Sequence, residues 1–350
     1  MKKVLLGFSI LSLLFIAACS NKSNTPPPTN PQQTPYTPPV VSSSFSKGAD
    51  ISWVTQMESA GYKFYDKNGN QMDLFTLMKS LGFNSIRLRA WVNPTGGWCN
   101  TADVLAKALR AKAAGMKVLL DFHYSDTWAD PGHQTVPAAW ASLDFADLVT
   151  TMHTYTIATL DTLVAHGVTP TWVQVGNETD DGMLWPDGLA TSNMTQYATM
   201  VESGYQAVKS VNSSIKVIVH ISDGYDNAHY EWLLDGIKAG GAQWDIIGMS
   251  LYPSTSNWSA YDTECLANIN TLVTRYGTPC MVVEVGMEAS DPSDSRSFLS
   301  DIITKVNSVA SGNGLGVFYW EPEAYNWQSY GLGAFDTTGK PTEALDAFGN

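Results

Sequence analysis

The chain has 350 residues, of which 33 are acidic and 20 basic, and its formal net charge at pH 7 is −13. This charge argues against nucleic acid or another anionic polymer as the partner and favours a neutral ligand. The twelve Trp and fifteen Tyr are unusually many, and such rings are the side chains on which the apolar faces of sugars stack.

The first 18 residues have the pattern of a secretory signal. Lys2 and Lys3 form a positive segment, and an apolar run from Val4 to Ile16 follows. This run is too short and wrongly flanked for a membrane span. The residues before Cys19 resemble a bacterial lipobox, which implies cleavage before Cys19 and lipid attachment to it. Ordinary signal cleavage near the same point is the alternative. We therefore expect an exported protein, lipid-anchored to the bacterial cell envelope.

Residues 19–45 are rich in Pro, Ser and Thr. Such a segment cannot bury a core, and its composition predicts a disordered, semi-rigid tether. Residues 46–350 have the length of one (β/α)8 barrel, and we see no linker or repeat within them. We therefore expect one folded domain from residue 46 onward, monomeric and held away from a membrane surface by the tether.

Besides Cys19, the chain contains Cys99, Cys265 and Cys280, so at most one disulfide can form among these three. The sequence leaves open whether Cys265 and Cys280 meet in space. No Cys/His spacing is typical of a zinc site.

Apolar segments rich in β-forming residues alternate with helical patterns from residue 46 onward. We predict strands at 47–53, 84–91, 117–123, 171–178, 216–221, 244–251, 280–285 and 315–320, and helices between them that include 103–114, 145–166, 195–211 and 261–276. This alternation predicts a parallel (β/α)8 barrel with right-handed crossovers. An open doubly wound sheet is the alternative, and the lack of a Gly-rich phosphate loop after the first strand weakens it.

Polar and aromatic residues gather where seven of the eight predicted strands end. They include Arg87, Arg89, Asp121, His123, Asn177, Glu178, His220, Ser222, Ser250, Tyr252, Glu284, Trp320 and Glu321. Because the carboxyl ends of barrel strands carry the active site in enzymes of this architecture, we expect these side chains to surround a catalytic cleft.

Glu178 and Glu284 each follow apolar strand residues and would point over the barrel mouth. Hydrolysis of a glycosidic bond needs two carboxyl groups, one protonated and one ionised. We expect Arg89 to help keep Glu284 ionised, since a nearby positive charge favours the anion. The structural alternatives are a helix cap for the first glutamate and an ordinary ion pair for the second.

These residues resemble the glycoside hydrolases of clan A. The chain from Phe45 to Asn350 most resembles family 53, the endo-β-1,4-galactanases, also called arabinogalactan endo-1,4-β-galactosidases. The motifs that carry the resemblance are 48–52, 86–91, 121–132, 173–178 and 182–186. The resemblance implies endo-acting, retaining hydrolysis of β-1,4-galactan, the side chain of pectic arabinogalactan, to galacto-oligosaccharides.

The resemblance also implies roles for individual residues. Glu178 would be the acid/base, and Glu284 the nucleophile that forms a covalent glycosyl-enzyme. Further implied roles are binding of the sugar 2-hydroxyl by Asn177, contacts around the nucleophile and its sugar by Arg89, His123 and Tyr252, and stacking by Trp91, Trp128 and Trp320. Core packing is the alternative for each of these tryptophans. Asp126 and Asp130 would either bind sugar hydroxyls or hold their loop.

Some bacterial members of the family bind calcium in the loop after the seventh strand. Here residues 287–296 form a short loop, and Asp291 and Asp294 do not reproduce the alternating ligands. Calcium is therefore possible but unsupported, and we expect no required cofactor.

Two other functions stay open at this point: another clan A activity, such as mannanase or xylanase, and a non-catalytic glycan-binding lipoprotein. The presence of both Glu178 and Glu284 argues against the second.

Overall fold

The computed structural model describes residues 36–349. The predicted signal peptide, Cys19 and most of the predicted tether lie outside the described residues. A compact unit begins at Pro38, ahead of the predicted boundary at residue 46. Phe45 is buried, and the Ser42 N–H donates to Asn307 Oδ1 at 3.0 Å. Within residues 36–349, no helix has the length and apolarity needed to cross a bilayer.

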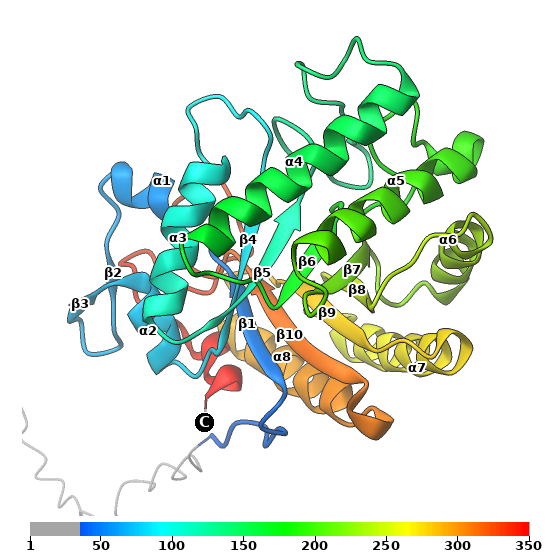
Figure 1. Cartoon of the computed structure of the whole chain (residues 1–350). Helices are drawn as coiled ribbons and strands as arrows, with labels where there is room; N and C mark the ends of the chain where they lie inside the picture. The colour runs from blue at the N-terminus through cyan, green and yellow to red at the C-terminus, as the bar shows by residue number, and fades with distance from the viewer. Residues whose placement is uncertain (1–35, 350) are drawn as a thin grey trace, which may run out of the picture. The chain divides into compact units, whose positions relative to one another are not determined.

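Eight parallel strands close into a barrel in the described part of the chain, which confirms the predicted fold and excludes an open sheet (Figure 1). Around the barrel the order is β1, β10, β9, β8, β7, β6, β5 and β4, and β4 pairs with β1. The strands are β1 (Ser46–Asp50), β4 (Ser85–Ala90), β5 (Lys117–Phe122), β6 (Trp172–Val175), β7 (Lys216–Ile221), β8 (Ile246–Leu251), β9 (Cys280–Val285) and β10 (Gly314–Trp320).

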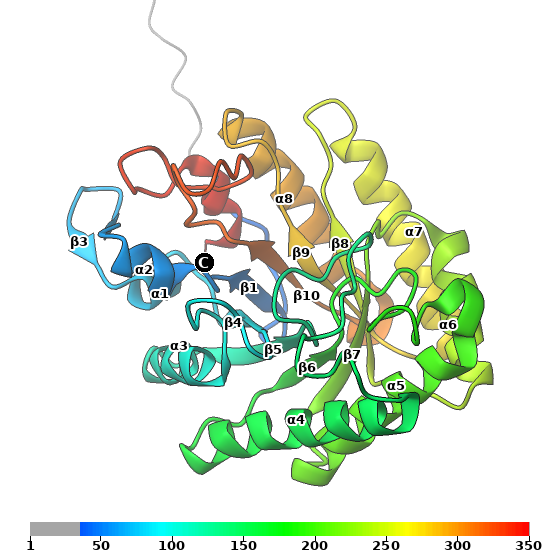
Figure 2. The same cartoon turned by 90° about the horizontal axis from the view of Figure 1, so that it is seen from above.

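Helices surround this barrel, as the view from above shows (Figure 2). They are α2 (Leu74–Ser80), α3 (Thr101–Ala113), α4 (Phe145–Ala165), α5 (Ala190–Val211), α6 (Asn227–Ala239), α7 (Trp258–Tyr276) and α8 (Pro292–Asn307). A short helix α1 (Val54–Ser59) and a hairpin of β2 (Phe64–Tyr65) and β3 (Gln71–Met72) are inserted before α2, and 3-10 turns lie at η1 (Ala310–Gly312) and η2 (Glu343–Phe348).

One end of the barrel interior is closed by apolar side chains. Leu119, Trp172, Ile218, Ile246, Met281, Val283 and Phe318 form a buried cluster separate from the larger one that includes the helices. Trp172 of β6 and Phe318 of β10 come from opposite strands of the barrel and meet edge to face at 6.2 Å.

The interior becomes polar toward the carboxyl ends of the strands. Asp121, Gln174 and His220 each come two residues after an apolar member of that cluster, on β5, β6 and β7. Because side chains of a strand alternate between its two faces, these polar groups share the interior face, one step nearer the mouth.

An irregularity in β9 places Glu284 on this face. Regular alternation would turn Glu284 outward, since Val283 already belongs to the interior cluster. However, the consecutive residues Met249 and Ser250 of β8 pair with Val282 and Glu284 of β9. β9 therefore carries one extra residue at this point. The pairing of β9 with β10 is also shifted by one residue here. Such a bulge re-aims the side chain that follows it. The carboxylate therefore faces the barrel mouth.

Candidate active site

A cleft of about 310 Å³ opens at the carboxyl ends of the strands. Its lining residues are His123, Trp128, Ala129, Asp130, Asn177, Glu178, Tyr252, Glu284, Trp320, Tyr330 and Leu332. Both predicted catalytic glutamates therefore border one cavity.

A tight turn after β6 carries Glu178 to the cleft. The strand ends at Val175, three residues before the predicted end at 178. Gly176 follows with φ 90°, and Glu178 itself has φ 42°, in the left-handed region that few non-glycine residues adopt. A Cβ on Gly176 would lie 2.5 Å from Thr179 Cγ2. The turn therefore needs glycine at 176, and a strained residue at its end is typical of a functional position.

The surroundings of Glu178 favour a protonated carboxyl. Burial and the negative charge of Glu284 raise the pKa of Glu178 well above its ordinary value. Against this, its Oε1 accepts one hydrogen bond from Ser250 Oγ at 2.6 Å. A carboxyl that keeps its proton near neutral pH can act as a general acid.

Glu284 is held by two strong donors. Its Oε1 lies 2.7 Å from Arg87 Nη2, and its Oε2 accepts a hydrogen bond of 2.7 Å from the Tyr252 hydroxyl. Burial raises the pKa of Glu284, while the Arg87 charge and the Tyr252 hydrogen bond oppose that rise. The contacts thus favour the carboxylate form at Glu284 more than at Glu178.

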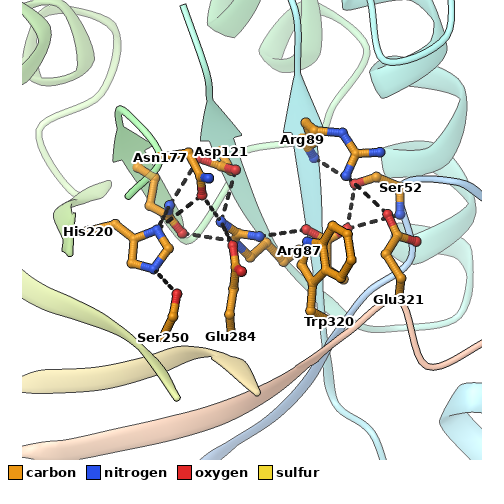
Figure 3. Close-up of polar contacts among 12 residues, drawn as sticks. Ser52, Arg87, Arg89, Asp121, Asn177, His220, Ser250, Glu284, Trp320 and Glu321 are labelled. Carbon is orange, nitrogen blue, oxygen red and sulfur yellow. Dashed lines mark hydrogen bonds and ion pairs between the residues drawn. The ribbon is translucent and has the colours of Figure 1, made fainter. Parts of the chain in front are cut away.

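The arginine beside Glu284 is Arg87, so the prediction that Arg89 keeps Glu284 ionised is wrong. Arg87 is fully buried and also pairs with Asp50 at 2.7 Å and Asp121 at 2.9 Å (Figure 3). Arg87 lies two residues before Arg89 on β4, one step deeper in the barrel, and its long side chain reaches up to Asp121 and Glu284.

Arg89 instead supports the aromatic side of the cleft. It pairs with buried Glu321 at 3.1 Å. Its guanidinium carbon lies 4.9 Å from the ring centre of Trp91 and 4.3 Å from that of Trp128, distances at which a cation attracts an aromatic face.

Trp128 and Trp320 line the cleft, whereas Trp91 is not among its lining residues. The rings of Trp128 and Trp320 meet edge to face at 5.8 Å, and Tyr330 extends this aromatic wall at 5.0 Å from Trp320. Trp91 packs against Trp128 at 5.1 Å, and its N–H donates to His123 Nδ1 at 3.2 Å. Trp91 therefore supports the wall from behind.

His123 lines the cleft as a neutral ring. Its Nδ1 accepts the backbone N–H of Ala129 at 3.1 Å, so Nε2 carries the hydrogen that faces Asp121 at 3.0 Å. Burial lowers the pKa of His123, which keeps the ring uncharged. It positions the loop that follows β5.

Asn177 lines the cleft with its amide already oriented. Arg87 Nη2 donates to its Oδ1 at 2.8 Å, and its Nδ2 donates to Ala129 O at 2.8 Å. Since an amide nitrogen carries two hydrogens, one remains for a ligand.

The two loop aspartates differ in position. Asp126 does not line the cleft. Its carboxylate accepts hydrogen bonds from the backbone N–H groups of Asn93 and Ala138, both at 2.9 Å. This contact pattern is that of the loop-holding alternative. Asp130 borders the cleft and also contacts His133 Nδ1 at 2.8 Å.

Part of the site was not predictable from the sequence. His220 and Ser250 were visible as polar strand ends, but no role was inferred for them. Tyr330 and Leu332 come from the long segment after β10, where no periodic pattern marks a cleft residue.

Cys99, Cys265 and Cys280 are buried and unpaired. Among residues 36–349, no group of three or more His, Cys, Asp or Glu side chains is arranged to hold a metal ion.

A closed (β/α)8 barrel whose mouth holds one buried and one half-buried carboxyl group in unlike surroundings, beside an aromatic wall, has the architecture of a glycoside hydrolase. The sequence matches one family of this class over residues 46–348, and the chain belongs to glycosyl hydrolase family 53.

Named relatives agree with this membership. A probable arabinogalactan endo-β-1,4-galactanase A from Neosartorya fischeri is 35% identical over 298 residues, which cover 79% of this chain and 83% of the relative. A solved structure of fungal β-1,4-galactanases matches with TM-score 0.80 and 32% identity, covering 87% of this chain and 98% of that one. A family 53 catalytic domain from Ignisphaera aggregans matches with TM-score 0.81 and 30% identity, covering 89% and 98%.

Proposed function

We propose that this enzyme is an endo-acting β-1,4-galactanase that cleaves the galactan of pectic arabinogalactan with retention of configuration. The observation that carries the mechanism is the unlike pair of carboxyls in one cleft. Glu284 has a cation and a phenol as donors, whereas Glu178 has one serine hydroxyl. Family membership and the names of the relatives support the substrate.

In the first step, ionised Glu284 attacks the anomeric carbon and Glu178 gives its proton to the leaving oxygen. The covalent bond removes the negative charge of Glu284. Since that charge raises the pKa of Glu178, the pKa now falls. Glu178 can then take a proton from the water that releases the sugar, at the same pH.

The rest of the cleft suits a neutral sugar. Trp128 and Trp320 offer apolar ring faces, and the free N–H of Asn177 is placed to donate to a hydroxyl beside the reacting carbon. A hydrogen bond of this kind strengthens as charge develops on the sugar ring.

A time course of products tests this function. Purified β-1,4-galactan, β-mannan and xylan are each incubated with the enzyme, and Glu284→Ala serves as the inactive control. We expect cleavage of galactan, with long oligosaccharides appearing first because attack is internal. Comparable kcat/KM on mannan or xylan would instead favour another clan A activity, and tight galactan binding without cleavage would favour a binding protein.

We also propose that the enzyme is a monomer, exported and anchored through lipid on Cys19, as the lipobox-like sequence supports. Cells that express the full chain should incorporate labelled palmitate into it, and Cys19→Ala should abolish the label and release the protein from membranes. An unlabelled wild-type chain would contradict the anchor, and a dimer in light scattering would contradict the monomer.

A further inference from the structure

A chain of hydrogen bonds runs from the buried ion cluster to Glu178. Arg87 Nε donates to Gln174 Oε1 at 2.8 Å, and Gln174 Nε2 lies 3.0 Å from His220 Nδ1. His220 Nε2 lies 2.8 Å from Ser250 Oγ, which donates to Glu178 Oε1 at 2.6 Å (Figure 3 shows Arg87, His220 and Ser250). The first four members are at most 1% exposed, so water does not compete for these bonds.

The orientation of the Gln174 amide is fixed at both ends. Its Oε1 accepts from Arg87, and its Nε2 donates to Asp121 Oδ1 at 3.0 Å. Because a guanidinium can only donate and a carboxylate can only accept, the amide cannot be reversed. Gln174 therefore presents an N–H to His220.

This orientation fixes the tautomer of His220. Its Nδ1 faces two donors, Gln174 Nε2 and, at 3.3 Å, the backbone N–H of Glu178. Asn177 Oδ1 lies 3.1 Å from the same nitrogen and already accepts from Arg87, so it is a single acceptor against two donors. Burial, followed by the Arg87 charge, lowers the pKa of His220 well below its ordinary value. The ring is therefore neutral, with Nδ1 bare and the hydrogen on Nε2.

The direction of the Ser250 hydroxyl follows from this tautomer. His220 Nε2–H donates to Ser250 Oγ, so the hydroxyl hydrogen can only point to Glu178 Oε1. We infer that Ser250 and His220 are positioning residues that keep Oε1 of Glu178 an acceptor and confine the acidic proton to Oε2. This inference rests on the proposed role of Glu178 as the acid/base.

One oxygen then performs both proton transfers. The Oε2–H bond breaks when the proton moves to the leaving oxygen, and Oε2 later takes a proton from the attacking water, while the Oε1 contact is unchanged. A donor to Oε1 stabilises the carboxylate more than the carboxyl, so Ser250 also lowers the pKa of Glu178. The charged and titratable groups around Glu178 are Glu284, Asp180, Arg87, His220, Tyr252 and Tyr230.

Ser250→Ala and Ser250→Thr test the inference on the full chain. In Ser250→Ala, we expect the alkaline limb of kcat/KM against pH to move up by about one unit, because a hydrogen bond to the anion is lost. We expect kcat on galactan to fall about tenfold, since the proton is no longer confined to the reactive oxygen. An aryl β-galactoside with a good leaving group needs little acid assistance, so its glycosylation rate should change less than twofold.

Ser250→Thr keeps the hydroxyl and should restore the wild-type profile. Ser46→Ala is the matched control, because Ser46 is also a buried barrel-strand serine but its hydroxyl has no hydrogen-bond partner within residues 36–349. Ser46→Ala should leave both limbs of the pH profile of kcat/KM unchanged. If Ser250→Ala does not fold, Ser250→Cys, a weaker donor of similar size, carries the same expectation.

An unchanged alkaline limb in a folded Ser250→Ala, or an equal loss on both substrates, would show that Ser250 only packs and would overturn the inference. A carbon-13 NMR titration of the Glu178 carboxyl, without substrate, separates this inference from the proposed function. Its midpoint should rise in Ser250→Ala even if the wild-type enzyme were to prefer another glycan, and an unmoved midpoint would refute the inference alone.

Discussion

Removal of the Tyr252 hydroxyl should make Glu284 harder to ionise. In Tyr252→Phe, Glu284 Oε2 loses the hydrogen bond of 2.7 Å that the phenol donates. Tyr252 is 37% exposed, so loss of one oxygen should not disturb the core. The Arg87 contact at 2.7 Å remains, so the carboxylate still forms, but at higher pH.

The size of the effect follows from the strength of this bond. A hydrogen bond to a charged group contributes about 1.5–3 kcal/mol, and a shift of one pKa unit corresponds to about 1.4 kcal/mol. Because the bond favours the anion, its loss raises the pKa of Glu284, and the acid limb of kcat/KM should move up by about one pH unit. At a pH just below the wild-type limb, kcat/KM should fall about tenfold from ionisation alone.

The assay is kcat/KM on soluble galactan from pH 3 to 9. Tyr330→Phe is the matched control, since Tyr330 lines the same cleft but donates to the Trp320 carbonyl at 3.2 Å. Whatever its effect on KM, it should leave the acid limb in place. An acid limb that is identical in Tyr252→Phe and the wild type would refute the assignment of that limb to Glu284.

Three further outcomes are expected. Glu284→Ala should lower activity by several orders of magnitude, and added azide should restore turnover with inverted product configuration. Near-normal activity of the folded variant would exclude Glu284 as the nucleophile. Glu178→Gln should lose the alkaline limb on galactan yet still form the glycosyl-enzyme from an activated aryl galactoside, and a full bell-shaped profile would exclude Glu178 as acid/base. Burial and the facing Asp301 raise the pKa of Asp262 to about 9. Because of this raised pKa, the folded protein loses stability as the pH rises from the ordinary pKa of Asp toward 9. Asp262→Asn should therefore raise the free energy of unfolding at pH 7 by on the order of 3 kcal/mol, or Tm by about 5 °C, and should change it little at pH 4. The exposed Asp161→Asn is the charge control, and an equal gain at both pH values would contradict this reasoning.

The strand pattern allowed the barrel and both glutamates to be predicted, because apolar runs ending in polar residues mark strands that enter a site. The depth at which each side chain lies within the barrel was not predictable from the sequence. Arg87 and Arg89 have the same alternation, and only the packing of their long side chains decides which guanidinium reaches Glu284. The orientation of Glu284 itself depends on the extra residue in β9, which no local pattern reveals.

The contacts that support the cleft residues could not be predicted from the sequence either. Trp91 and Trp128 look alike in sequence, yet one packs behind the wall and the other faces the cleft. The order of His220, Ser250 and Glu178 along one hydrogen-bond chain joins β7, β8 and the turn after β6, so it follows only from the side-by-side pairing of these three strands.

The central claim is that Glu178 and Glu284 cleave β-1,4-galactan by two successive displacements. Proton NMR of galactan during the first minutes of hydrolysis tests this most directly, because it reports the configuration of each new reducing end before mutarotation. With two displacements, we expect β-configured ends to appear first and α-configured ends to follow only at the rate of mutarotation. If α-configured ends appear first, a single displacement by water has occurred, and the role of Glu284 as a covalent nucleophile is contradicted.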